Sequence, residues 1–309
     1  MMRLAALALF VALYSAGCGF GAGDEQKGGA QLRVTKDFGH EELSADNVAT
    51  IHEDETIMRL LQSRHDVDTR FGGNFVEAID GVEGAGGGGT RDWFYFVNGI
   101  WADRGAADWE VHGGDVIQWD NRDWSAKEHI PAIVGAWPEP FRSGFEGRRL
   151  PVRLECADED AEACSDVKDA LTRTGGQVSS AQLAASGGKE IVRVLVGTWD
   201  QLRDVRTPAL LGEGPDVSGV FAEFADDPER LELLDENGDV ARTADAGTGL
   251  VAATALEDQA VVWMVTGLDD VGVQAAAATL DARSLRNAFA VAATPDGPLK
   301  LPVIEGDGG

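Results

Sequence analysis

At 309 residues the chain exceeds one typical compact domain, which indicates two domains, and 44% hydrophobic residues suffice for a sizeable core. Lysine and arginine together number 26 against 53 aspartates and glutamates, a formal net charge of −27. A field of that sign repels phosphate backbones and anionic lipid, which argues against nucleic-acid binding and against membrane docking by charge alone. Any membrane association therefore has to come from an anchor.

The chain begins with the pattern of a secretory signal. Arg3 supplies a positive charge, and Leu4 to Leu13 form an unbroken apolar run. This run is about half of the ~20 residues that a membrane-spanning helix needs. It therefore predicts a cleaved signal peptide over residues 1–17 rather than a transmembrane helix. Residues 18–30, rich in glycine and charge, are predicted to be a flexible tether.

The residues that end this leader, Ser15-Ala16-Gly17-Cys18, resemble the lipobox of bacterial lipoproteins. The resemblance implies that the Cys18 thiol is acylated and that Cys18 becomes the new N-terminus. The protein would then be extracytoplasmic and lipid-anchored to the cell membrane. Ser15 departs from the pattern, which prefers leucine or a similar residue there, and a plain secretory signal cut nearby is the alternative.

Residues 31–137 are predicted to form an α+β domain, with one helix on a sheet of about five short strands. Apolar residues alternate with polar ones at 32–35, and residues 55–65 carry apolar side chains at helical spacing. Strands are expected at 75–79, 93–97, 109–111 and 116–119. Asn98-Gly99 predicts a tight hairpin turn after the segment 93–97.

Aromatic residues concentrate in this first domain, which holds six of the eight tryptophans. Trp93 and Tyr95 should share one face of their strand, with Phe94 and Phe96 on the other. Such rings either fill a core or form platforms for planar ligands, and both interpretations stay open. The candidate ligand-binding residues are Trp93, Tyr95, Asn98, Trp101, Trp109 and Trp119.

The second half follows a linker predicted at residues 138–150, which is rich in proline, glycine and arginine. Strands are expected at 152–154, 191–196, 220–224, 261–265 and 289–293, a hairpin at 231–240, and helices at 158–173 and 269–280. Their alternation predicts an α/β sandwich over residues 151–303, with a sheet either parallel or mixed. Residues 304–309 are predicted to be a disordered tail.

Cys156 and Cys164 remain after the leader cysteine. In an oxidising compartment this pair predicts a disulfide, with a reduced pair as the alternative. No Gly-x-Ser-x-Gly, His-Glu-x-x-His or phosphate-loop motif is present, and none of the five histidines stand at i, i+4 spacing. The sequence thus predicts no catalytic residue, no metal site and no cofactor; His40, His52 and His65 could still converge in space.

Four motifs of the first domain resemble a domain of unknown function related to the C-terminal β-domain of transcobalamin and intrinsic factor. They are Thr56-Ile57-Met58-Arg59-Leu60-Leu61, Ile79-Asp80-Gly81, Trp93-Phe94-Tyr95-Phe96-Val97-Asn98-Gly99 and Gly114-Asp115-Val116-Ile117-Gln118-Trp119. The resemblance implies a small β-grasp-like sheet with one helix. In transcobalamin-like proteins this domain caps the corrinoid, while a separate helical domain, which this sequence lacks, supplies the rest of the pocket.

These observations favour a membrane-tethered extracytoplasmic binding lipoprotein. Its candidate ligand is planar, a corrinoid such as cobalamin, and its candidate partner is a transporter or a cell-surface protein. The alternative is a non-catalytic structural or protein-interaction module of the cell surface. An enzyme would need a site assembled from distant residues. The position of the largest cavity, on the aromatic sheet or between the domains, would discriminate between these hypotheses.

Overall fold

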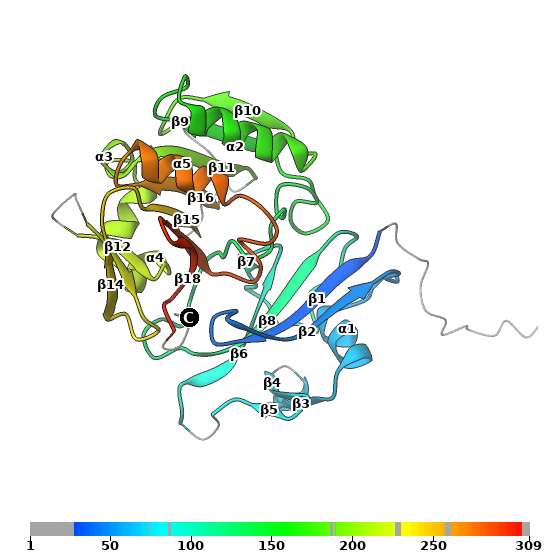
Figure 1. Cartoon of the computed structure of the whole chain (residues 1–309). Helices are drawn as coiled ribbons and strands as arrows, with labels where there is room; N and C mark the ends of the chain where they lie inside the picture. Colours follow the sequence, from blue (N-terminus) through cyan, green and yellow to red (C-terminus); the bar gives the residue numbers. More distant parts are fainter. Residues whose placement is uncertain are drawn as a thin grey trace, which may run out of the picture.

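The computed structural model describes residues 28–304, except for residues 74, 86–87, 186–187, 189, 226–229 and 257–260 (Figure 1). The predicted signal peptide, Cys18, the tether before residue 28 and the tail beyond residue 304 lie outside the described residues. Within the described part, no helix combines the length and apolar character needed to cross a bilayer.

The N-terminal part is built on a mixed five-stranded sheet with the order β2-β1-β8-β6-β7. Its strands are β1 (Ala30–Lys36), β2 (Glu41–Val48), β6 (Arg91–Val97), β7 (Ile100–Trp101) and β8 (Val116–Asp123). β1 pairs antiparallel with β2 and parallel with β8, which in turn pairs antiparallel with β6. A helix α1 (Ile57–Arg64) and a small sheet of β3 (Val67–Arg70), β4 (Phe75–Ile79) and β5 (Val82–Glu83) follow β2. One helix on a short-stranded sheet is the α+β arrangement that the sequence predicts.

α1 forms where the apolar spacing predicts it. The Thr56 hydroxyl caps the helix by accepting a hydrogen bond from the Arg59 backbone N–H at 3.3 Å. Ile57, Leu60 and Leu61 are buried against the sheet in one core with its tryptophans. The strand predicted at 109–111 is wrong, because Glu110 forms only an isolated bridge with Thr56. Trp109 and Val111 alternate with an exposed Glu110 because they line the core beside α1, not because they extend the sheet.

The C-terminal part is a seven-stranded sheet with the order β10-β9-β11-β16-β15-β17-β18. Its strands are β9 (Val152–Cys156), β10 (Val178–Ala181), β11 (Val192–Thr198), β15 (Gly249–Thr254), β16 (Val262–Gly267), β17 (Ala290–Thr294) and β18 (Gly297–Leu301). The first four in spatial order run parallel and the last three pair antiparallel, so the sheet is mixed.

Two layers cover this sheet. Helices α2 (Glu162–Arg173) and α5 (Asp270–Ala278) pack on one face around Trp263 (Figure 1). The other face packs against three short helical segments and a second sheet, in one core with Leu195 and Met264. The elements of this second layer are α3 (Trp199–Leu202), η2 (Pro208–Glu213), α4 (Pro215–Ser218), β12 (Ala222–Phe224), β13 (Leu231–Leu234) and β14 (Val240–Ala244). The layered, sheet-rich architecture agrees with the predicted sandwich.

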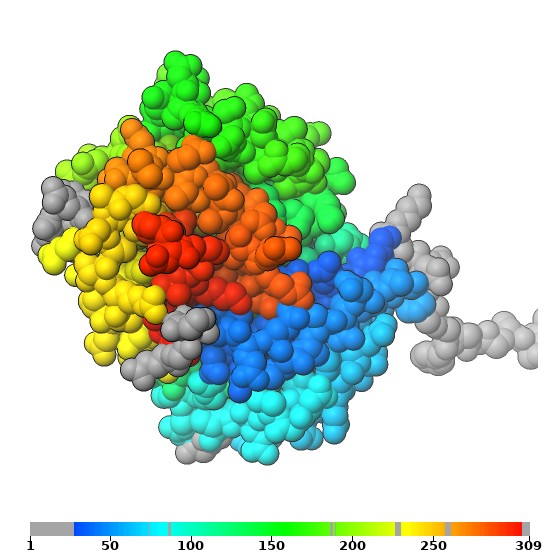
Figure 2. All heavy atoms as spheres, viewed as in Figure 1, coloured from blue at the N-terminus to red at the C-terminus, as the bar shows by residue number. Residues whose placement is uncertain are grey.

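The C-terminal part also covers the second face of the N-terminal sheet. Phe96 and Phe38 lie in the same core as residues of the C-terminal sheet. Both rings pack edge-on against Phe289, at 5.4 and 5.3 Å between centroids, and Phe38 also contacts Phe221 at 5.0 Å. The two parts therefore share a continuous core, and in Figure 2 their surfaces meet without a gap along the blue and orange segments.

Residues 138–150, predicted as a linker, join the two parts and are anchored at their start. Phe141 is 2% exposed, and its ring lies 4.9 Å from that of Trp263 in the C-terminal core. The preceding residues Ile133 and Val134 are fully buried, each in a different core. This stretch is consequently packed over its first half and exposed around Arg148 and Arg149.

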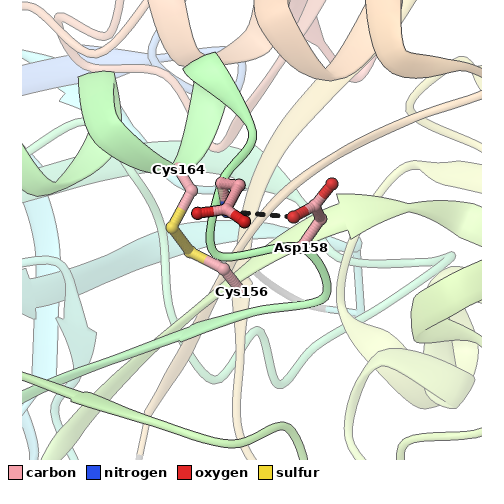
Figure 3. Close-up of a disulfide and its surroundings, with 4 residues drawn as sticks. Cys156, Asp158 and Cys164 are labelled. Carbon is pink, nitrogen blue, oxygen red and sulfur yellow. Dashed lines mark hydrogen bonds between the residues drawn. A yellow bond between two sulfur atoms is a disulfide. The ribbon is translucent and has the colours of Figure 1, made fainter.

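The predicted disulfide joins Cys156, at the end of β9, to Cys164, in the first turn of α2 (Figure 3). Residues 158–161, predicted as the first turn of this helix, form the loop that the disulfide closes, and the Asp158 side chain accepts the Asp160 backbone N–H at 2.9 Å. Closing a loop of this size with a disulfide stabilises the folded protein by about 2–3 kcal/mol, because it lowers the entropy of the unfolded chain.

Candidate functional site

A cleft of about 760 Å³ lies between the edge of the N-terminal sheet and the C-terminal part. It exceeds in volume a groove beside β1, about 620 Å³, and a crevice of about 530 Å³ near the ends of β9 and β11. We call it the Trp101 cleft. Its apolar lining is Ile100, Trp101, Pro131, Phe145, Leu150, Ile191, Val192, Leu210, Val217, Ala255, Leu256 and Val261. Both parts of the chain supply walls, so the cleft lies between them rather than on the aromatic face of one sheet.

Trp101 is presented to the cleft by the short edge strand β7. The Asn98-Gly99 turn, with φ values of 53° and 77°, reverses the chain so that Ile100 pairs back onto Val97, as the sequence predicts. The Trp101 backbone N–H donates to the Pro131 carbonyl at 3.0 Å. Its ring contacts three other rings, with centroids 5.4 Å away for Phe94, 5.8 Å for Phe96 and 5.1 Å for His129, which also lines the cleft. A half-buried indole fixed in this way can offer a ring surface to a ligand.

The other candidate aromatics lie together in the core beneath α1. Trp93, Tyr95, Trp109 and Trp119 are 2–8% exposed. Tyr95 stacks on Trp119 at 4.7 Å and meets Trp109 edge-on at 6.5 Å. The Tyr95 hydroxyl donates to the Arg104 carbonyl at 2.6 Å, and burial raises its pKa. These four rings pack the N-terminal core and do not reach the cleft.

Asn98, another candidate ligand-binding residue, also has a structural role. The residue is fully buried, and its amide donates to Asp115 at 2.8 Å and to the Gly144 carbonyl at 2.9 Å. Its side-chain oxygen accepts the Val116 backbone N–H at 2.8 Å. All of its hydrogen-bonding atoms are thus engaged in tying the turn to β8 and to the connecting segment. Of the six candidates, the structure places Trp101 at the cleft.

The charged residues that line the cleft contact groups of opposite charge or a backbone carbonyl. Arg148 forms an ion pair with Glu190 at 2.8 Å, and Glu146 accepts a hydrogen bond from Arg104. Lys127 donates to the carbonyl of Asp216. The cleft therefore combines apolar side chains with charged ones that are held in ion pairs or hydrogen bonds. Such a site suits a small molecule with an apolar body and a polar end.

Part of the cleft lining comes from segments for which the sequence pattern predicts no helix or strand. Leu210 lies in η2 and Val217 in α4, two short helical segments that each begin at a proline. Proline at the first helical position is the one local signal that could have indicated them. Helical segments of six and four residues have too few positions for an apolar period to show.

The histidines do not assemble a metal site. His65 contacts Asp80 at 2.7 Å and Asp46 at 3.2 Å, whereas His40 lies 2.9 Å from the Pro302 carbonyl of the C-terminal part. Within the described ranges, no group of three or more histidine, cysteine, aspartate or glutamate side chains is arranged to hold a metal ion.

One protein-family model matches a segment of the N-terminal part. Residues 54–123 match the family model described as a domain of unknown function, DUF4430. All four motifs quoted above fall inside this range, so the predicted domain of unknown function is confirmed for this segment. No curated protein matches the chain significantly.

Two solved structures resemble parts of the chain. A protein from Ruminococcus gnavus ATCC 29149, described as a "putative metal binding protein", is 15% identical with a TM-score of 0.25; the match covers 31% of this chain and 98% of that one. Haptocorrin in complex with Cbi is 13% identical with a TM-score of 0.25, over 36% of this chain and 29% of haptocorrin. The chain thus spans less than a third of haptocorrin, and likeness at this level says nothing about function.

Proposed function

We propose that this protein is a lipid-anchored extracytoplasmic binding protein that takes a small amphipathic molecule with a planar apolar body into the Trp101 cleft. The cleft itself carries the proposal: its volume of about 760 Å³ is within the range of small-molecule sites, roughly 300–1,000 Å³. Both parts of the chain supply apolar side chains to its lining, and its one indole contacts three neighbouring rings. Binding without catalysis agrees with the lack of catalytic motifs in the sequence.

The cleft is tested by titrating the processed protein with anilinonaphthalene sulfonate, an amphipathic aromatic dye, while tryptophan-to-dye energy transfer is recorded. We expect saturable binding at one site. Trp101→Ala should weaken it about tenfold, equivalent to about 1.4 kcal/mol, which is within the range of one aromatic contact. The matched control is Trp124→Ala, because Trp124 is also half-buried but donates to Asp92 at 2.9 Å, away from the cleft. Equal effects of the two substitutions would refute the cleft as the site.

A parallel titration with cyanocobalamin tests the corrinoid as ligand. If a corrin ring enters the cleft, tryptophan emission of the wild type is quenched at micromolar ligand, and Trp101→Ala reduces the quenching. If the dye binds and cyanocobalamin does not, the cleft serves another planar ligand.

The anchor has its own support in the leader and Cys18. We expect radiolabelled palmitate to attach to the wild type in cells of the source organism, and Cys18→Ala to carry no label. Cys156→Ser with Cys164→Ser is the control, and it should keep the label, since those thiols form the disulfide. Recovery of unlabelled, unprocessed wild-type protein from the cytosol would contradict the anchor.

A second function, a non-catalytic structural or interaction module of the cell surface, is favoured by one observation. Trp93, Tyr95, Trp109 and Trp119 are core residues, so packing alone accounts for four of the five candidate aromatic residues. This alternative predicts that the dye does not bind saturably to the folded protein.

A further inference from the structure

A second cavity, independent of the Trp101 cleft, lies where β1 begins. It measures about 620 Å³ and is bordered by the start of β1, by residues 137–143 and by the loop after α5. In Figure 2 this orange loop lies against the blue N-terminal strands. We call it the arginine groove, after Arg33, Arg142 and Arg286, which line it together with Trp137 and Ser143. A neighbouring pocket shares Trp137 and Arg142 with it and adds Arg173.

Arg33 is buried in the groove wall without a carboxylate as hydrogen-bond partner. The residue is only 6% exposed. The guanidinium donates to the Gly135 carbonyl at 2.8 Å, to the Asn287 side-chain oxygen at 3.3 Å and to the Gln31 side-chain oxygen at 2.7 Å. All three acceptors are neutral. They accept hydrogen bonds but supply no negative charge, and a positive charge held away from water is costly without one.

A second guanidinium increases this excess. Arg286 forms a bidentate pair with Glu42, with both nitrogen–oxygen distances at 2.8 Å. Burial, followed by repulsion from Arg286, lowers the pKa of Arg33 to about 10, and Glu42 offsets only part of this. Two arginines thus share one carboxylate on this side of the groove. An anion entering here would relieve the repulsion between them.

Two carboxyls also line the groove, and uncharged donors occupy their oxygens. Glu139 accepts the Ser143 backbone N–H at 2.7 Å and the Ser143 hydroxyl at 2.9 Å. Asp115 accepts from Asn98 and from the His112 backbone N–H, each at 2.8 Å. Burial raises the pKa of both carboxyls. The Arg142–Glu139 distance of 3.8 Å is longer than a hydrogen bond, so the exposed Arg142 side chain keeps its guanidinium fork available at the rim.

From these contacts we infer that the arginine groove binds the oxyanion group of a ligand, a phosphate or a carboxylate. Arg142 binds it directly at the rim through its planar fork, and Arg33 and Arg286 supply the field that attracts it. In a chain of net charge −27, three arginines and two carboxyls, Asp115 and Glu139, line this one cavity. Gly29 and Ala30 border the groove as well, so it lies where the predicted tether joins the fold. A lipid headgroup and a free phosphate are both sources of the same chemistry.

The inference is tested on the processed full-length protein at low ionic strength by isothermal calorimetry with inorganic phosphate and with acetate. Cosedimentation of unacylated Cys18→Ala protein with phosphatidylglycerol–phosphatidylcholine vesicles forms a third arm, because the acyl chain would bind any bilayer, and phosphatidylcholine vesicles are its blank. We expect saturable binding in at least one arm, reduced fivefold or more by Arg142→Gln. Binding of free phosphate indicates a soluble ligand, of acetate a carboxylate, and of vesicles alone a headgroup.

The chain offers a closely matched control, Arg203→Gln. The Arg142 and Arg203 side chains are 52% and 51% exposed, and each forms an i,i+3 pair, with Glu139 at 3.8 Å and Asp200 at 3.3 Å. Arg203→Gln should leave binding unchanged. Absence of binding in all three arms, or an equal loss in both variants, overturns the inference. Trp101→Ala should not affect the oxyanion, so failure here is distinguishable from failure of the cleft.

Discussion

Replacing Trp109 by alanine is expected to lower the free energy of unfolding by about 3–5 kcal/mol, the range for truncating a large buried aromatic. The residue is 2% exposed. Its ring contacts Tyr95 at 6.5 Å and Phe145 at 5.4 Å between centroids, and the Arg104 guanidinium lies over it at 4.1 Å. Removing it leaves a cavity between α1 and the connecting segment. Urea denaturation followed by tryptophan fluorescence and circular dichroism measures the change.

Phe71→Ala is the aromatic control for this substitution. Phe71 is 81% exposed and contacts Phe75 at 6.4 Å, so we expect a change within about 0.5 kcal/mol. A Trp109→Ala protein as stable as the wild type, but altered in dye binding, would show that the ring belongs to a ligand surface instead of the core.

Asp120→Ala is expected to destabilise the protein by about 3–5 kcal/mol, because it leaves buried donors unpaired beside a buried cation. Asp120 is fully buried on β8. Its oxygens accept from the Thr35 hydroxyl at 2.6 Å and from the backbone N–H groups of Phe38 and Gly39 at 3.1 and 2.8 Å. The charge of the nearby Arg122, also fully buried, is offset in part by Asp120 and Glu128.

The same carboxylate holds the strained turn that joins β1 to β2 and packs against the C-terminal part. Asp37 and Phe38 have φ values of 53° and 56°, a region that costs a non-glycine residue of order 1–3 kcal/mol. The turn inserts Phe38 against Phe221 and Phe289 of the C-terminal part. Asp120→Ala should therefore also speed proteolysis between the two parts. Asp200→Ala is the control, since its side chain is 66% exposed and its ion pair contributes less than about 1 kcal/mol. Equal stability of the two variants would contradict the role assigned to Asp120.

The sequence predicts elements well where side-chain alternation coincides with burial. Alternating aromatics at 93–97 give β6, the apolar spacing near Leu60 gives α1, and Asn98-Gly99 gives the turn. β2 escapes prediction because its side chains are mostly exposed and polar; pairing with β1, not burial, makes it a strand. β18 escapes because it opens with Gly297-Pro298, which predicts a turn, and pairing with β17 at the sheet edge makes it a strand.

The candidate site was only partly predictable. Trp101 and Trp109 are indistinguishable in local sequence, and their different environments follow from where α1 and the C-terminal part pack. The far wall of the cleft, including Leu210 and Val217, comes from helical segments too short to show a period. The arginine groove could not be anticipated, because its three arginines are brought together by β1, the connecting segment and the loop after α5.

The most direct test of the proposed function is to map where an amphipathic aromatic probe attaches. Bis-ANS, which photoincorporates on irradiation, would be bound at one equivalent to the folded protein, and the labelled peptides would be identified by mass spectrometry. We predict labels on peptides that contain Trp101, Ile191, Leu210 or Leu256, which face one another across the cleft, and loss of these labels in Trp101→Ala. Labelling confined to other surfaces, or unchanged by that substitution, would contradict a binding site in the Trp101 cleft.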